Sequence, residues 1–296
     1  MNIEYDPKKI GPVIRRAMHE AIAVIREQAA TFIAESKTHY DGVREDIVTT
    51  ADRAAQEVYI THFTKYLPGF GLVGEEDGLR RPCTIPHDDV YITIDPLDGT
   101  KAFARGQSHG VGTMVGVVRG GKIVAGFVGD VNTGEIYGFD PENPVPIRTR
   151  FGVDQVLASD TSMPLARRYV MSNTSPTEFS RQVRKILFKH SQGGLCKDVE
   201  VLGGSYGTFF ARLWKGEVAI LLLDPAHSTP WDEVPVLGIS KALGVVYFRI
   251  NPETLEVHDC DPAIPHAPVP TPYITVAVLP GYAGEVENFL RGMICE

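Results

Sequence analysis

The chain has 296 residues, of which 43% are hydrophobic and 22% are charged, and these proportions are typical of a soluble globular protein. Its length allows one large domain or two closely joined lobes. The formal net charge of -8 argues against broad electrostatic binding to DNA or RNA, which requires a basic surface.

The N-terminal half is predicted to place two helices over a mostly antiparallel sheet. Apolar residues recur at three- and four-residue spacing over 7–36, which predicts a first helix. A second helix is expected from Thr50 to Tyr66, because Pro68 and Gly69 follow it. The apolar runs that predict strands are 70–78, 90–100, the two arms of 111–131 around Gly120–Gly121, and 134–139.

The C-terminal half alternates strands and helices, which is typical of an α/β fold. The Pro-rich stretch 140–150 is the best candidate boundary, so we expect lobes at 1–145 and 146–296. Strands are expected at 167–172, 217–223, 244–250 and 273–279, and helices at 177–190, 205–214, 231–243 and 284–292. The Pro-rich segment 259–272 is expected to be an irregular loop, either a plain insertion or a cover for a pocket or an interface.

The chain is predicted to be cytoplasmic. No stretch reaches the roughly 18 apolar residues of a transmembrane helix, and the first ten residues contain no apolar core of a signal peptide. The cysteines form no CxxC pair, so we expect reduced thiols and neither a zinc ribbon nor a redox motif. They are Cys83, Cys196, Cys260 and Cys295.

Acidic residues gather at the ends of apolar runs and at expected helix starts. They are Asp46, Asp52, Glu75, Glu76, Asp95, Asp98, Asp232 and Glu233. Acids are common in turns and favour the positive end of a helix dipole in its first turn, and this structural explanation suffices for Asp52 and Glu233 taken alone.

The segment "DPLDGT" at 95–100 carries more than a turn requires. Asp95 follows a strand that must be buried, and Pro96 fixes the backbone after it. Two carboxylates and the Leu97 carbonyl aimed in one direction would suit a hard cation such as Mg²⁺, Mn²⁺ or Ca²⁺. Two carboxylates about 5 Å apart repel by roughly 3 kcal/mol at an effective dielectric near 20, so several in one pocket require a cation or raised pKa values.

Two other motifs fit this segment poorly. In an EF-hand loop the glycine stands sixth, whereas Gly99 is fifth when Asp95 is counted as the first position. The DxDGT motif of haloacid-dehalogenase-type phosphatases has one residue between its aspartates, whereas this sequence has two.

Four motifs in one order resemble the inositol monophosphatase superfamily of Mg²⁺-dependent phosphomonoesterases. They are "DIVTTAD" at 46–52, "GEED" at 74–77, "DPLDGT" at 95–100 and "WDEVP" at 231–235. The resemblance implies a layered αβαβα sandwich, of the type shared with fructose-1,6-bisphosphatase, with the site between the two lobes. It also implies a small phosphorylated metabolite as substrate, a homodimer, and no nucleic-acid or membrane partner.

The resemblance implies roles for individual residues. Two or three Mg²⁺ ions would be held by Glu75, Asp95, the Leu97 carbonyl, Asp98 and Asp232. Thr100 and Asp46 would orient and deprotonate the attacking water, and Glu75 would take part in catalysis as a bridging ligand. Glu76 would hold a metal-bound water or act only structurally.

The substrate side is implied less specifically. The amides of Gly99 and Thr100 would bind phosphate oxygens, while Gly204, Ser205 and Asp224 would face the rest of the substrate. Lys101 and Arg105 are placed to meet either a second phosphate or solvent.

Inositol 1-phosphate is the substrate expected by default. The alternatives are 3'(2'),5'-bisphosphate nucleotidase, histidinol-phosphatase or fructose-1,6-bisphosphatase activity. A further alternative is a catalytically silent relative that binds metal and a phosphorylated ligand. The presence of Thr100 and Asp46 favours an enzyme.

Overall fold

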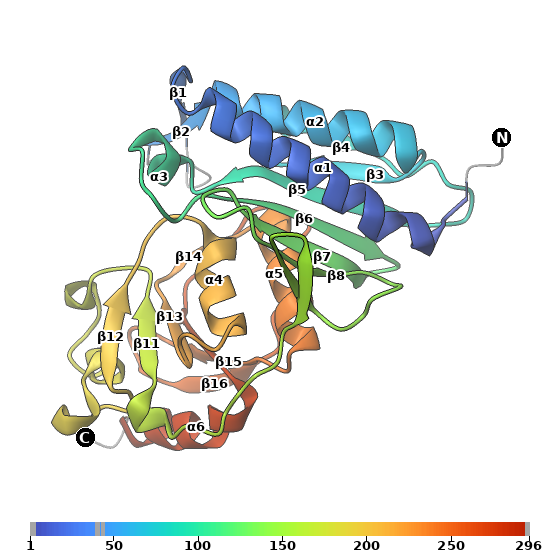
Figure 1. Cartoon of the computed structure of the whole chain (residues 1–296). Coiled ribbons are helices and arrows are strands. Elements are labelled where there is room, and N and C mark those ends of the chain that lie inside the picture. Colours follow the sequence, from blue (N-terminus) through green and yellow to red (C-terminus); the bar gives the residue numbers. More distant parts are fainter. Residues whose placement is uncertain (1–3, 39–41, 43–44, 294–296) are drawn as a thin grey trace.

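The structure is a computed structural model that describes residues 4–38, 42 and 45–293. Helices and two large β-sheets alternate in layers, as Figure 1 shows. Together the layers form the predicted αβαβα sandwich. Among the described residues, none of the helices combines the length and apolar character that crossing a bilayer requires.

The outer layer consists of helices α1 (Pro7–Gln28) and α2 (Thr50–Tyr66), which lie side by side (Figure 1). The side chain of Asp6 accepts a hydrogen bond from the Lys8 amide at 3.1 Å and begins α1. Apolar side chains of both helices pack against the first sheet. The largest of them are Ile10, Ile14, Met18, Ile25, Tyr59 and Phe63.

The predicted first helix, 7–36, extends too far, whereas the prediction for α2 is confirmed. Helix α1 ends at Gln28, and the chain then forms strand β1 (Ala34–Thr38), which pairs antiparallel with β2 (Glu45–Thr49). Ile33 continues the helical apolar spacing but is 64% exposed. The Ile33 carbonyl accepts a hydrogen bond from the Thr50 amide at 3.0 Å instead, which directs this segment into the hairpin.

The first large sheet has eight strands and lies beneath α1 and α2. Neighbouring strands are antiparallel except for β3 and β5, which are parallel. In spatial order the strands are β10 (Val153–Val156), β9 (Ile147–Arg150), β8 (Ile136–Phe139), β7 (Lys122–Asp130), β6 (Gly112–Arg119), β5 (Val90–Asp98), β3 (Gly71–Gly74) and β4 (Arg80–Arg81).

The middle layer holds helices α4 (Tyr206–Trp214) and α5 (Pro230–Ala242), which lie between the two sheets (Figure 1). Glycines on the first sheet let α5 approach closely. A Cβ on Gly116 would lie 2.3 Å from Cγ1 of Val234, and one on Gly126 would lie 2.9 Å from the Pro235 carbonyl oxygen. This close packing brings the start of α5 to the end of β5.

The second large sheet has six strands, and helix α6 (Ala283–Gly292) covers its outer face (Figure 1). Val286 and Leu290 of α6 are buried in the same core as this sheet. Strand β11 is parallel to both β12 and β13, and the remaining pairs are antiparallel. In spatial order the strands are β12 (Asp198–Val201), β11 (Tyr169–Ser172), β13 (Ile220–Leu223), β18 (Ile274–Val278), β15 (Val246–Ile250) and β16 (Val257–Cys260).

Two sequence predictions for the second half are wrong. The segment 177–190 forms no α-helix but short 3₁₀ turns at Pro176–Glu178, Val183–Leu187 and His190–Gln192. Its apolar spacing arises because Phe179, which follows the first of these turns, and Val183 and Ile186, which lie in the second, insert into the core. The segment 259–272 is not wholly irregular, since its strand β17 (Val269–Thr271) pairs antiparallel with β14 (Ala226–Ser228).

The division into lobes at 145/146 stays a prediction. Strands β9 and β10 follow that position in the sequence but pair with the first sheet. A short helix, α3 (Thr100–Ala104), follows β5 at the edge of the region described next.

Candidate metal centre

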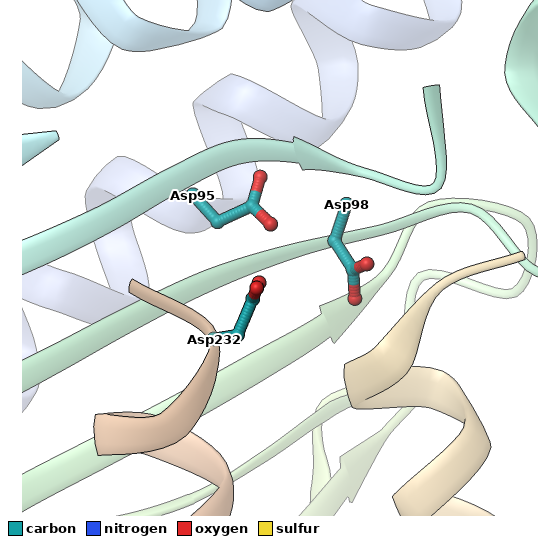
Figure 2. Close-up of side chains that lie close together, drawn as sticks. All are labelled: Asp95, Asp98 and Asp232. Carbon is teal, nitrogen blue, oxygen red and sulfur yellow. The ribbon is translucent and has the colours of Figure 1, made fainter. Parts of the chain in front are cut away.

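Three aspartates meet where the first sheet contacts the middle layer. Asp95 and Asp98 come from the end of β5, and Asp232 comes from the first turn of α5. One carboxylate oxygen from each lies within 4.8 Å of the others. Figure 2 shows the three carboxyl groups pointing toward one another. The structure thus brings together the side chains of two distant motifs, as the sequence predicted.

The end of β5 is shaped to present two carboxylates. The pairing of β5 with β6 shifts register between Asp95 and Asp98, which breaks the alternation of faces along the strand. Oδ1 of Asp95 accepts a hydrogen bond from the Leu97 amide at 3.1 Å. The Asp95 carbonyl oxygen accepts another from the Thr113 hydroxyl at 3.1 Å. These contacts fix the turn that carries the two acids.

Asp98 and Asp232 are oriented by helix starts. Asp98 accepts hydrogen bonds from the Ser205 hydroxyl at 2.5 Å and from the amides of Tyr206 and Gly207 at 2.8 and 2.7 Å. Oδ2 of Asp232 accepts a bond from the Thr229 hydroxyl at 2.7 Å. Ser205, predicted to face the substrate, therefore orients Asp98 in this structure.

The trio is electrostatically costly without a cation. Burial raises the pKa of Asp95 well above its ordinary value, and the nearby charges of Glu75, Asp98 and Asp232 raise it further. Burial and the charges of Asp98 and Glu75 likewise raise the pKa of Asp232. Burial raises the pKa of Asp98 to about 6, although its three hydrogen bonds oppose the rise. Carboxylate oxygens that converge in this way are suitable ligands for a hard divalent cation.

Glu75 lies beside the trio and is paired with a lysine. Nζ of Lys37, from β1, lies 3.0 Å from Oε1 of Glu75 and 2.7 Å from Oε1 of Glu76. Burial and the neighbouring charge of Glu75 raise the pKa of Glu76 to about 7. Sequence reasoning missed Lys37, because the start of β1 was expected to be helical and the lysine lies 38 positions before Glu75.

Most of the predicted site residues line one cavity. Its volume is about 320 Å³, and it opens beside the trio. Its lining includes Asp46, Glu75, Leu97, Gly99, Thr100, Lys101, Arg105 and Gly204. Asp224 does not line this cavity; it lines a neighbouring one that shares only Asp232 with it.

The predicted pairing of Thr100 with Asp46 is wrong. The Thr100 hydroxyl lies 3.0 Å from Oδ1 of Asp52 and 3.0 Å from the Leu97 carbonyl oxygen. Asp46 instead lies 3.2 Å from Nζ of Lys101. The reason is geometric: Asp46 lies on strand β2, whereas Asp52 lies in the first turn of α2.

Asp52 is a candidate residue that the sequence argument explained only structurally. Its Oδ2 accepts hydrogen bonds from the amide and hydroxyl of Thr49 at 2.7 and 2.5 Å, which completes a capping box. Its Oδ1 faces Thr100. Burial raises the pKa of Asp52, and the hydrogen bonds from Thr49 and Thr100 oppose that rise. One carboxylate therefore both begins α2 and holds Thr100.

Gly99 allows the turn after Asp98 to approach the loop before α4 closely. Its φ of 88° lies in the left-handed region, and an added Cβ would lie 2.3 Å from the Gly110 carbonyl oxygen and 2.7 Å from the Ser205 amide nitrogen. That amide donates to the Gly110 carbonyl at 2.8 Å. The turn after Asp98 thus packs directly on the loop before α4.

Known proteins resemble this chain in sequence and in fold. A profile of the Inositol monophosphatase family matches residues 6–278. Inositol monophosphatase 1 of Solanum lycopersicum is 25% identical over 247 residues, covering 81% of this chain and 80% of the relative. The human 3'(2'),5'-bisphosphate nucleotidase 1 is 26% identical over 145 residues, and that match covers 41% of this chain and less than half, 42%, of the nucleotidase.

Solved structures agree with the fold. The Thermotoga maritima IMPase superposes with a TM-score of 0.70 at 16% identity, covering 95% of this chain and 96% of that one. An IMPase/NADP phosphatase complexed with Mg²⁺ and phosphate also superposes with a TM-score of 0.70, at 17% identity, covering 96% and 94%. Because the family profile spans nearly the whole length and the layers match, the chain belongs to the inositol monophosphatase family.

Proposed function

We propose that this protein is a Mg²⁺-dependent phosphomonoesterase of a small phosphorylated metabolite. The observation that carries the proposal is the convergence of the buried Asp95 and Asp98 with the half-buried Asp232. Glu75 and the Leu97 carbonyl, which line the same cavity, would complete the ligand set. Bound divalent cations would neutralise the carboxylates, attract an anionic phosphate and lower the pKa of water.

The chain's own residues would bind, orient and move a proton. We propose that Thr100 Oγ1 accepts a hydrogen bond from the attacking water and passes its own proton toward Oδ1 of Asp52, which lies 3.0 Å away. Asp52 replaces Asp46 in this role because of that distance. The amides of Gly99 and Thr100 are proposed to contact phosphate, since both residues line the cavity.

The substrate is a second part of the proposal. Inositol 1-phosphate remains the first compound to test, because family members similar to this chain carry the name inositol monophosphatase. Other similar proteins are named as bisphosphate nucleotidases or as an NADP phosphatase, so nucleotide phosphates belong in the same panel.

The test is phosphate release from a panel with and without Mg²⁺. The panel contains inositol 1-phosphate, fructose 1,6-bisphosphate, histidinol phosphate, 3'-phosphoadenosine 5'-phosphate and NADP. Mg²⁺-dependent release from one member supports the reaction class and identifies the substrate class. Binding of Mg²⁺ without any release would favour a catalytically silent relative.

We also propose a cytoplasmic homodimer. Apolar side chains are exposed along the β9–β10 hairpin, including Phe151 at 86%, Val153 at 60% and Val156 at 66%. Strand β10 is also an edge of the eight-stranded sheet, so a second copy could both cover these side chains and pair with its backbone. Sedimentation of the wild-type protein and of a Val153→Asp, Val156→Asp variant tests the dimer, which the variant should dissociate.

A further inference from the structure

Arg80 contacts two parts of the candidate metal centre without lining its cavity. It lies on β4, which follows Glu75 after a reversal of the chain through the 3₁₀ turn Glu76–Gly78. A hydrogen bond from the Gly74 amide to the Leu79 carbonyl at 3.0 Å closes this reversal. The reversal therefore returns Arg80 to the side of Gly74, the residue directly before Glu75.

The first contact of Arg80 is with the backbone that carries Glu75. Although the side chains of β4 are exposed, Nη1 of Arg80 reaches inward and donates to the Gly74 carbonyl oxygen at 3.0 Å in a half-buried contact. The amide of the same peptide unit, that of Glu75, donates to the Ile94 carbonyl at 3.1 Å. Both polar groups of this peptide unit are bonded, which fixes the direction in which the Glu75 side chain leaves the backbone.

The second contact of Arg80 is with Trp231 in the first turn of α5. Cζ of the guanidinium lies 5.3 Å from the centroid of the Trp231 ring, which is within the range of a cation–π contact. Trp231 is 3% exposed and directly precedes Asp232. One guanidinium group therefore contacts the residue before Glu75 and the residue before Asp232.

Other contacts hold these acids within their own elements. The Gln56 side chain bonds the amide of Glu76 at 3.2 Å and its carbonyl at 3.1 Å, which fixes the backbone after Glu75. The Thr229 hydroxyl donates to Asp232 at 2.7 Å within the first turn of α5. Arg80 differs because it links the first sheet, which carries Glu75, to the middle layer, which carries Asp232.

We propose that Arg80 is a positioning residue that sets Glu75 relative to Asp232, so that both acids can contact the bound cations. The inference rests on the proposed function, since it requires both acids to be cation ligands. Mg²⁺ demands a near-octahedral arrangement of ligands at about 2.0–2.1 Å, so a small displacement of one acid weakens binding. Residues that orient metal ligands typically contribute about 10- to 100-fold to metal affinity.

The sign of the effect separates positioning from charge. Arg80 is positively charged, so removing it would strengthen the binding of a cation nearby if charge alone mattered. Loss of a positioning contact instead weakens cation binding. A merely structural role would lower the unfolding temperature of the metal-free protein and leave Mg²⁺ affinity unchanged.

Mg²⁺ affinity tests the inference without turnover. Mg²⁺ is titrated by calorimetry into the wild-type protein, Arg80→Met and Arg81→Met. Arg81 is a matched control, because it is the other residue of β4, is exposed, and has its guanidinium 3.4 Å from the Thr64 hydroxyl on α2. We expect Arg80→Met to weaken Mg²⁺ binding by about tenfold, and Arg81→Met to change it by less than about twofold.

Phosphate release provides a second readout on the same three proteins. We expect Arg80→Met to raise the Mg²⁺ concentration that gives half the maximal rate by about tenfold, with kcat at saturating Mg²⁺ changed by less than about threefold. Metal-free unfolding midpoints within a few degrees of the wild type show that the variants remain folded.

Each contrary outcome has a distinct meaning. If the wild-type protein binds no Mg²⁺, the proposed function fails, and the inference falls with it. If the wild type binds Mg²⁺ and Arg80→Met binds it equally well or more tightly, the proposed function stands and the positioning role is overturned. Equal weakening in Arg80→Met and Arg81→Met also overturns it, because the effect would then not depend on the contacts with Gly74 and Trp231.

Discussion

The hydroxyl of Thr100 lies 3.0 Å from Oδ1 of Asp52, whereas Asp46 lies 3.2 Å from the ammonium group of Lys101. Both acids belong to the segment "DIVTTAD", and both are placed near the candidate metal centre. The geometry therefore gives them different partners, with Asp52 in contact with the threonine that is proposed to orient the attacking water.

The two acids provide a matched pair of variants. We expect Asp52→Asn to lower kcat by about 10²- to 10⁴-fold with little change in KM, because general base assistance is lost. Asp46→Asn should lower kcat by less than about tenfold, because it removes only a partly exposed ion pair with Lys101. Steady-state kinetics measure both effects. A larger loss for Asp46→Asn would restore the original pairing and contradict the geometry.

Asp52 also begins α2, so its variant needs a stability control. Asparagine keeps an oxygen that can accept from the Thr49 amide, and the fold should survive the change. A thermal unfolding midpoint within a few degrees of the wild type separates a catalytic loss from an unfolding loss.

The buried carboxyl groups predict how metal-free stability depends on pH. A carboxyl group whose pKa is raised on folding stabilises the protein below its unfolded pKa, and that stability is lost as pH rises through the folded pKa. For Asp98 this window runs from 3.8 to about 6, and the raised pKa values of Asp95 and Asp232 extend it upward. The metal-free protein should therefore lose stability as the pH is raised through this range.

Mg²⁺ should counter this loss. A ligand that binds only the folded state raises its stability by mass action, and the ionised carboxylates bind the cation best. Differential scanning calorimetry should show a larger Mg²⁺-induced rise in the unfolding midpoint at about pH 8 than at about pH 5. An equal rise at both pH values would mean that these carboxyl groups are not the ligands.

Substitution of Gly99 should destabilise the protein through steric clashes, and the same substitution at Gly120 separates this effect from backbone strain. Gly99 and Gly120 both have positive φ, 88° and 53°, but only at Gly99 would an added Cβ meet other atoms within 4 Å. Gly120→Ala should cost about 1–2 kcal/mol of unfolding free energy from backbone strain alone. Gly99→Ala should cost about 1–3 kcal/mol more, because overpacking against Gly110 and Ser205 is added. Denaturant unfolding measures both, and equal losses would show that the loop before α4 gives way freely.

Much of the fold was predictable where a local signal and the tertiary structure agree. Helix α2 was predicted with both ends, since Pro68 and Gly69 follow it, and in the structure Thr49 caps its start. The first helix and the segment 177–190 were mispredicted because helical spacing of apolar residues also arises in other ways. Ile33 continues that spacing but is exposed. Phe179 is buried just after one 3₁₀ turn, and Val183 and Ile186 are buried from the next.

Some residues of the candidate site could likewise be predicted from the sequence, and others could not. Asp95, Asp98 and Asp232 stand in recognisable motifs, so their convergence could be expected. The contact of Lys37 with Glu75 spans 38 positions, and that of Thr100 with Asp52 spans 48, with no pattern that links the partners. Glu233 looked like an ordinary acid of a first helical turn, and only the structure shows that it lines a cavity together with Arg249.

Asp95 is proposed to help hold the cations on which phosphate release depends. The most direct test measures Mg²⁺ binding by calorimetry and Mg²⁺-dependent phosphate release for the wild-type protein and for Asp95→Asn. We predict that the wild type binds Mg²⁺ and releases phosphate from at least one member of the panel, and that Asp95→Asn loses both while remaining folded. An Asp95→Asn protein that turns over at a near-normal rate would show that phosphate release does not depend on a cation held by Asp95.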